Sequence, residues 1–258
     1  MTVRALWLLL LLLALATAAR AEIPLSERRS GYVDMSPQTR AMQDDDTTSP
    51  ATLWVLDGEA LWAKKAGAAA LACTDCHHDA RDSMKGAATR HPAFDAATGK
   101  ILNLEGRINR CRAERQKEKA LAYESRELLA LTAFVARQSR GLPIQVESSE
   151  RTRPFIEAGR AAFQRREGQL DLACAQCHDE RAGKRLAGML IPQGHPTAYP
   201  VYRLEWQGVG SLHRRLRNCL VAIRAEPYPL GAPEYVELEM YLMWRARGMP
   251  LESPGVRP

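Results

Sequence analysis

After its first residues, the sequence has no apolar run long enough to span a bilayer, which takes about 20 helical residues. The apolar run at residues 6–16 is itself too short to span a bilayer, and it follows a short basic start. A small-x-small triplet at residues 19–21 completes the pattern of a signal peptide over residues 1–21. An uncleaved anchor is the alternative, but the short run favours cleavage. We therefore expect an exported periplasmic protein with no membrane attachment once the signal is removed.

Cysteine is scarce, with six residues in the chain, a number that in an exported protein would normally suggest disulfides. Four of them lie in two Cys-x-x-Cys-His motifs, formed by Cys73, Cys76 and His77, and by Cys174, Cys177 and His178. In this motif the two thiols form thioethers with haem vinyl groups and the histidine becomes the proximal iron ligand. A zinc or redox-active Cys-x-x-Cys is the alternative, but the duplication and the export signal favour two covalently bound haem c groups.

The two motifs lie in an internal repeat. Gly58 and Gly159 each stand fifteen residues before the first motif cysteine, and an aromatic residue, Trp62 or Phe163, follows each glycine after four residues. Amphipathic patterns then predict helices over residues 127–140 and 235–247, which both end in Arg-Gly-x-Pro. Each unit is therefore a helix, a haem motif, a long loop and a closing helix, with the glycine allowing two helices to cross closely.

Regular strand patterns are also scarce, and a haem can replace apolar side chains at the centre of a small core. We therefore predict an all-α protein with two tandem cytochrome c-like domains, long haem-wrapping loops and an N-terminal extension. The predicted segments are a signal peptide at 1–21, an extension at 22–50, a first haem domain at 51–145, and a second haem domain with the active site at 146–258.

The two remaining cysteines occupy equivalent places in the repeat. Cys111 and Cys219 are 108 residues apart and follow their proximal histidines by 34 and 41 residues, a reach that favours a thiolate on the distal face of each iron. The competing distal ligands are the methionines Met84, Met189, Met243 and Met249. A disulfide between Cys111 and Cys219 is a further alternative, although duplication does not predict a bond between equivalent points of two domains. Thiolate ligation would lower the haem potential.

The second of these cysteines has a basic setting. Arg215 precedes Cys219 by one helical turn, so the two side chains would share a face. A guanidinium there favours the thiolate and offers a fork for an oxyanion. Arg107 repeats this spacing before Cys111, but nearby acidic residues temper the charge at the first site.

Charge is also unevenly distributed along the chain. Residues 181–258 hold eleven Arg or Lys against six Asp or Glu, and the net charge falls from +6 to +4 on cleavage. This basic excess suits an anionic ligand or an acidic partner protein, and ordinary surface charge is the alternative. We expect no nucleic-acid partner.

Together these residues resemble the SoxA diheme cytochromes of periplasmic thiosulfate oxidation. The likeness runs over nearly the whole mature chain and includes both haem motifs. It is carried further by Ser30-Gly31-Tyr32, Met42-Gln43-Asp44-Asp45-Asp46, Gly58-Glu59-Ala60-Leu61-Trp62, Arg107-Ile108-Asn109-Arg110-Cys111, Tyr199-Pro200-Val201-Tyr202-Arg203, Arg217-Asn218-Cys219 and Pro254-Gly255-Val256-Arg257-Pro258.

The resemblance implies a heterodimer with SoxX, a smaller c-type cytochrome, that acts on the carrier SoxYZ. Such a complex is an L-cysteine S-thiosulfotransferase: it joins thiosulfate oxidatively to a carrier cysteine and passes two electrons to cytochrome c. The resemblance further implies that Cys219 is both distal haem ligand and persulfide-type nucleophile, that Arg215 binds substrate, and that Cys111 is the other distal ligand. A further active-site arginine near the C-terminus matches Arg245 or Arg247, and both remain candidates.

Two other functions compete with this one. A plain diheme electron carrier predicts methionine-ligated haems of high potential. A diheme peroxidase requires an open iron position, which a cysteine on each iron would fill. The cysteines therefore favour the sulfur-transferring enzyme.

Overall fold

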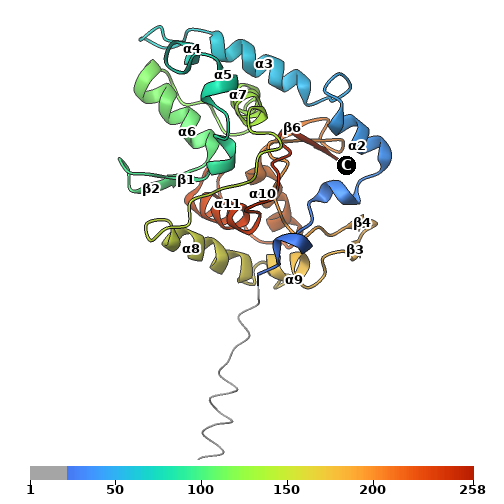
Figure 1. Ribbon diagram of the computed structural model, residues 1–258. Coiled ribbons are helices and arrows are strands. Elements are labelled where there is room, and N and C mark those ends of the chain that lie inside the picture. Colours follow the sequence, from blue (N-terminus) through green and yellow to red (C-terminus); the bar gives the residue numbers. More distant parts are fainter. Residues whose placement is uncertain (1–21) are drawn as a thin grey trace, which may run out of the picture.

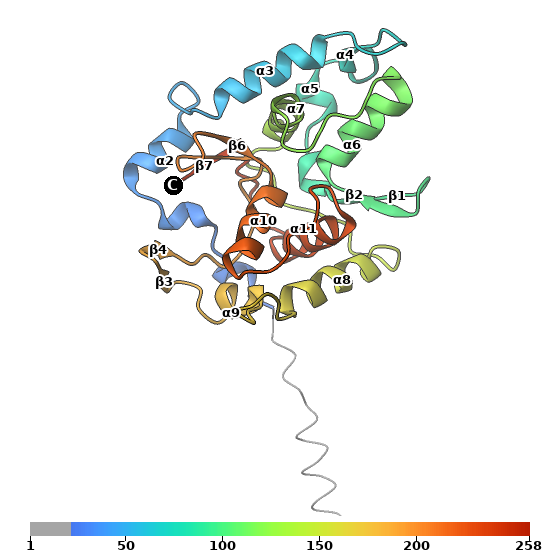
Figure 2. The same ribbon diagram turned by 180° about the vertical axis from the view of Figure 1, so that it is seen from behind.

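The computed structural model describes residues 22–258, so the predicted signal peptide lies outside the described residues. Among those residues, no helix has both the length and the apolar composition to cross a membrane. Figures 1 and 2 show the two repeats stacked, with α3 at one end and α8 at the other. The two repeats contain matching helices in the same order along the sequence.

Each half contains the first helix and the closing helix that the repeat predicts, with two further helices between them. In the first half these are α3 (Thr52–Ala63), α4 (Cys73–His77), α6 (Leu104–Cys111) and α7 (Arg126–Arg137), with a short α5 (Ala80–Ser83) and a π-helical turn (Arg112–Gln116). The matching helices of the second half are α8 (Arg153–Gln164), α9 (Cys174–His178), α10 (Leu212–Ala222) and α11 (Pro233–Arg245). The extension contains α2 (Pro37–Asp44) and short 3-10 turns at Leu25–Glu27 and Gly31–Asp34, and a third such turn is Ala88–Arg90.

Short strands occur in both halves, so the expected all-α class is not confirmed. Two hairpins pair β1 (Ala93–Asp95) with β2 (Lys100–Leu102), and β3 (Arg185–Leu186) with β4 (Met189–Leu190). A third sheet has β5 (Val201–Arg203) between antiparallel β6 (Gly208–Gly210) and parallel β7 (Gly255–Arg257). Strands of two or three residues are too short to show the alternation by which a strand is recognised in sequence.

The predicted helix crossings are present in both repeats. A Cβ atom on Gly58 would lie 2.1 Å from the carbonyl oxygen of Ala130, so α3 and α7 touch through their backbones. A Cβ atom on Gly159 would lie equally close, 2.1 Å, to the carbonyl oxygen of Glu237 on α11. The aromatic residues one turn later, Trp62 and Phe163, are buried. Glycine is therefore required at both crossings because any side chain would push the helices apart.

The two repeats pack against each other through one continuous apolar core, which includes Phe134 of α7 and Leu242 of α11. Their equivalent Gly-x-Pro segments also pair. The amide of Gly141 donates to the carbonyl of Leu251 at 2.8 Å, and the amide of Ile144 donates to Met249 at 2.9 Å. Segments equivalent in sequence thus meet at the centre of the molecule, and α11 lies between α6 and α8 (Figures 1 and 2).

The N-terminal extension packs on the second repeat. Gln43 of α2 is buried, and its side-chain oxygen accepts a hydrogen bond of 3.0 Å from the amide of Val256 in β7. The hydroxyl of Ser30 donates to Glu252 at 2.5 Å. The extension is therefore held by the C-terminal segment, and its Asp46 also pairs with Arg137 and Arg140 of the first repeat. The predicted boundaries between the segments stay a prediction.

Replacing Gly159 by alanine should destabilise the protein by about 1–3 kcal/mol, because the added methyl overpacks a backbone contact. Gly208→Ala is the matched control, since a Cβ there would meet its nearest neighbour at 3.7 Å, an ordinary contact. Denaturant unfolding of the haem-loaded proteins measures the difference. Equal midpoints for the two variants would contradict the close crossing.

Candidate functional site

The first haem motif borders a cavity of about 230 Å³. Cys73, Cys76 and His77 of α4 line it together with Cys111 from the end of α6. Its other walls are largely apolar, with Leu104, Ile108, Leu131 and Val135, while the arginines Arg90, Arg107, Arg112 and Arg115 also line it. Two motif thiols, an imidazole, a third thiol and several cations for propionates are the groups that fit a haem c.

The proximal histidine of this site is held in the form that binds a metal. The Trp62 ring lies 5.6 Å from the His77 ring. Burial, followed by the positive charges of Arg107 and His78, lowers the pKa of His77, which favours the neutral imidazole. His78, the next residue, is exposed.

At the second motif a loop carbonyl orients the histidine. Nδ1 of His178 lies 2.8 Å from the carbonyl oxygen of Pro192, and a hydrogen bond donated there leaves Nε2 as the ligand atom. Burial is also the main cause that lowers the pKa of His178. Sequence reasoning missed Pro192, because a backbone carbonyl in an irregular loop carries no residue-type signal.

Equivalent caps position the two remaining cysteines. The Asn103 side chain accepts from the amide of Gly106 at 2.9 Å and starts α6, while the Ser211 hydroxyl accepts from the amide of Arg214 at 3.2 Å and starts α10. Each cap lies eight residues before its cysteine, Cys111 or Cys219. Matching caps place each cysteine at the same position along its helix.

Cys219 lies close enough to the second motif to affect its thiols. Burial raises the pKa of Cys174 to about 12, and the charge of Cys219 is the next cause. The thiol of Cys219 itself has a raised pKa, because burial outweighs the opposing guanidinium of Arg215. Arg215 thus favours the thiolate, as predicted, but does not suffice alone. Coordination to a metal cation deprotonates a thiol outright.

The positions of the other candidate distal iron ligands distinguish between them. No disulfide joins Cys111 and Cys219, since all six cysteines are free. Met189 is 54% exposed in the β3–β4 hairpin, whereas Met243 and Met249 are buried in the core. Met84 lines the first cavity and remains a candidate beside Cys111.

The two repeats differ in how their arginines are engaged. Arg107 lies 3.7 Å from Asp95, and Arg110 forms ion pairs with both Asp95 and Glu114. At the second site, Arg215 exerts its charge on His178 and on Cys219. Arg107 and Arg110 are thus compensated by carboxylates, whereas Arg215 forms no ion pair in the described part of the chain.

The structure also separates the two C-terminal arginines. Nη2 of Arg245 lies 2.7 Å from Oδ1 of Asp179, the residue after His178, and its guanidinium lies 4.7 Å from the centre of the Phe163 ring. Arg247 instead stacks on Trp244 at 4.1 Å and pairs with Glu22 of the extension. Of the two, Arg245 is the one beside the second haem motif.

A further arginine and a tyrosine near Cys219 were not predicted as site residues. Arg203 is 8% exposed, with Nε 2.8 Å from a carboxylate oxygen of Glu205. Burial is the main cause that lowers the pKa of Arg203, followed by the charge of Arg215. Burial raises the pKa of Tyr199, while Arg215 and Arg203 oppose the shift. The Tyr-Pro-Val-Tyr-Arg motif that contains both was the available signal.

Comparison with known proteins agrees with this geometry. A family model described as the SoxA/TsdA cytochrome c domain matches residues 57–144 and 158–251. The L-cysteine S-thiosulfotransferase subunit SoxA of Pseudaminobacter salicylatoxidans is 33% identical over 91% of this chain and 82% of its own. That of Rhodovulum sulfidophilum is 32% identical over 93% and 84%. A chain in the crystal structure of SoxXA from P. pantotrophus superposes with a TM-score of 0.86 at 29% identity, over 90% of this chain and 87% of that one.

Distal ligation by the two cysteines can be tested at each site separately. Cys111→Met should convert one haem from a thiolate to a thioether ligand and raise its potential, because the thiolate donates more electron density. Electron paramagnetic resonance and a potentiometric titration measure this change, with Cys219→Met as the matched variant in the other repeat. An unchanged spectrum for Cys111→Met would assign the first distal position to Met84.

Proposed function

Because the chain belongs to the SoxA/TsdA cytochrome c family, we propose that it is the SoxA subunit of an L-cysteine S-thiosulfotransferase, acting in the periplasm. The observation that carries the proposal is Cys219 with Arg215 facing the second haem motif, within a chain whose similar relatives bear this name. An electron carrier would need no anion-binding arginine beside a buried thiol.

Each repeat supplies the ligands for one covalently bound haem c. Cys73 and Cys76 attach the first haem, with His77 and Cys111 as its axial ligands. The second is attached by Cys174 and Cys177, with His178 and Cys219 as its axial ligands. Haem, when bound, supplies one-electron acceptance to the site.

The residues around Cys219 bind and orient thiosulfate. The substrate is a dianion, so the guanidinium of Arg215 provides charge-assisted hydrogen bonds to its oxygens. This places the sulfane sulfur of thiosulfate against the sulfur of Cys219. Arg245 lies beside the same motif, where its ion pair with Asp179 fixes its position. In this proposal, Cys219 can also carry an extra sulfur atom as a persulfide.

The bonds, protons and electrons of the proposed reaction balance as follows. The Cys219 thiolate bonds through its sulfur to the sulfane sulfur of thiosulfate, and two electrons leave. The electrons pass one at a time to a c-type cytochrome, and the carrier thiol loses its proton to solvent. A carrier cysteine thiolate then attacks the sulfane sulfur and displaces the Cys219 thiolate, a step that involves no net oxidation.

The partners follow from the same family. The superposed P. pantotrophus structure is a SoxXA complex, which supports a heterodimer of this chain with SoxX. We propose SoxYZ as the carrier. The basic excess of residues 181–258 suits docking of an acidic partner near Cys219.

Cys219→Ala should abolish thiosulfate coupling to SoxYZ in the complex with SoxX, because it removes the acceptor sulfur. Cys111→Ala is the matched control and should retain coupling, since its site lacks the anion-binding setting. Intact mass shows whether both haems stay attached. Turnover by a haem-loaded Cys219→Ala protein would refute the proposed nucleophile.

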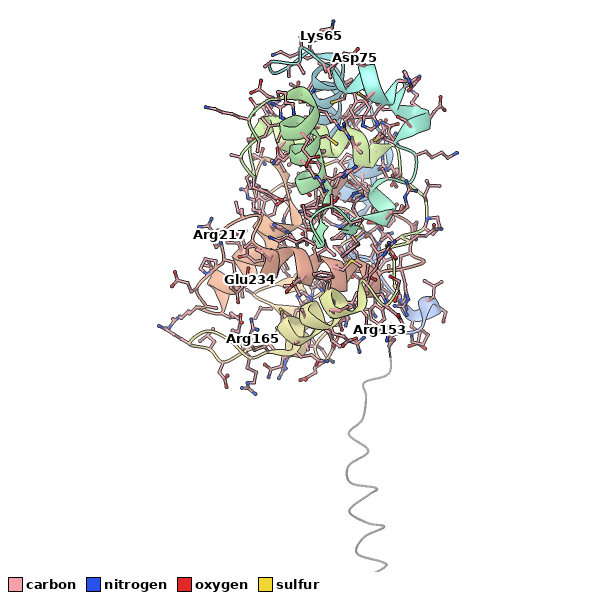
Figure 3. All side chains as sticks on the ribbon, turned by 90° about the vertical axis from the view of Figure 1, so that its left-hand side faces the viewer. Lys65, Asp75, Arg153, Arg165, Arg217 and Glu234 are labelled. Atoms are coloured by element: carbon pink, nitrogen blue, oxygen red, sulfur yellow. The ribbon has the colours of Figure 1, made fainter. Side chains whose placement is uncertain are left out.

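Arg215→Gln should raise the KM for thiosulfate by about 10- to 100-fold, since a hydrogen bond to a charged group contributes about 1.5–3 kcal/mol. Arg217→Gln on the same helix is the control, because Arg217 is exposed on the side of the molecule (Figure 3). Steady-state kinetics with varied thiosulfate measure both. Equal KM values for the two variants would exclude Arg215 from substrate binding.

A further inference from the structure

A group of acidic and aromatic side chains is buried where the two repeats meet. Glu105 comes from α6 of the first repeat and is 6% exposed. Glu239 comes from α11 of the second repeat, and His213 from α10 lies beside it with 1% of its side chain exposed. Both carboxylates line a cavity of about 30 Å³, enough for a water molecule. The haem sites described above use none of these three residues.

Hydrogen bonds orient the histidine toward Glu239. The amide of Gly231 donates to Nδ1 of His213 at 3.2 Å, and Nε2 lies 3.0 Å from Oε2 of Glu239. The Tyr123 ring stacks on His213 with 5.7 Å between centroids and holds it in place. Burial opposes protonation of His213, but the hydrogen bond and charge of Glu239, together with the charge of Glu105, raise its pKa. His213 therefore favours the ionised form of its partner Glu239.

The two carboxylates differ in their partners. Glu239 accepts a hydrogen bond of 3.2 Å from the Asn103 amide in addition to the contact with His213. No side chain in the described part of the chain donates to Glu105. Burial, followed by the negative charge of Glu239, raises the pKa of Glu105 to about 7, against the opposing effect of His213. Glu105 thus exchanges its proton in the neutral range, where small changes in potential alter its occupancy most.

Other titratable groups around the pair do not replace it. His91 lines the same cavity, but burial is the main cause that lowers its pKa, so it stays neutral. Burial raises the pKa of Tyr123, which also stays neutral. Glu124 adds a further negative charge, partly offset by Arg214 at 3.7 Å.

The cavity adjoins both haem domains. His91 and Leu104 line it and also line the first haem cavity. On the other side it is lined by Tyr199, whose pKa responds to Arg215 and to Cys219. Figure 3 shows the first repeat, marked by Lys65 and Asp75, and the second, marked by Arg153 and Arg165, at opposite ends of the molecule. The carboxylate pair therefore lies between the two redox centres.

We propose that Glu105 and Glu239 form a proton-binding site that takes up a proton when an electron enters either haem domain and releases it when the electron leaves. An added electron is a negative charge, which increases the proton affinity of a nearby carboxylate. The uptake balances one electron with one proton in a region of low dielectric. Electron and proton come from the thiol and thiosulfate coupling, and they leave to the partner cytochrome and to solvent. The inference rests on the two haem domains of the proposed function.

The test is the pH dependence of the haem potentials in the diheme protein. In the wild type, at least one midpoint potential should fall as the pH rises through neutrality, because the proton that stabilises the reduced form is lost. Glu105→Gln keeps the shape of the side chain but cannot titrate, so its potentials should not vary with pH in this range. A pH-indicator dye should likewise show proton uptake on reduction in the wild type and loss of that uptake in the variant.

Glu237→Gln is the matched control, because Glu237 lies on the same helix α11 as Glu239 and does not line the cavity. It should keep the wild-type pH dependence. Flat potentials in the wild type, or a slope retained in Glu105→Gln, would overturn the proposal. If Glu105→Gln does not load haem, the wild-type slope and Glu239→Gln decide instead. Thiosulfate coupling is a separate readout, so loss of coupling with an intact pH slope would reject only the proposed function.

Discussion

The backbone contact between helices at each repeat is the constraint on which the remaining structure depends. At Gly58 and Gly159 the facing carbonyl oxygen lies where a Cβ atom would be. This contact sets the distance between the first and last helices, and with it the place of Trp62 and Phe163 beside the proximal histidines. The first haem motif and Cys111 line one cavity beside these helices.

The two repeats share one arrangement of helices but differ in their charged side chains. In each repeat, Asn103 or Ser211 caps the helix that carries the cysteine outside the haem motif. In the first repeat, Arg110 is neutralised by carboxylates. In the second, Arg215 and Arg203 are both positive neighbours of Cys219. The arginine one turn before the cysteine thus differs between the repeats: Arg107 faces Asp95, whereas Arg215 forms no ion pair within residues 22–258.

Joining the repeats through one core has a further consequence. Glu105 and Glu239, from different repeats, are brought together in a region where water is largely excluded. Two neighbouring buried carboxylates cannot both remain ionised easily, and His213 contacts only Glu239. The interface between the domains therefore holds a group that responds to charge in either one, which neither repeat would contain alone.

The sequence by itself determined the repeat, the haem motifs, the glycine crossings and the pairing of Cys219 with Arg215, because each depends on spacing along one chain or one helix. It did not predict the strands, since β5 pairs with β7 across more than fifty residues and each is too short to show alternation. Only the tertiary structure placed Arg245 rather than Arg247 beside His178, brought Pro192 to its Nδ1, and buried Glu105 against Glu239. These contacts join loops and helices whose relative positions depend on packing, for which no local pattern exists.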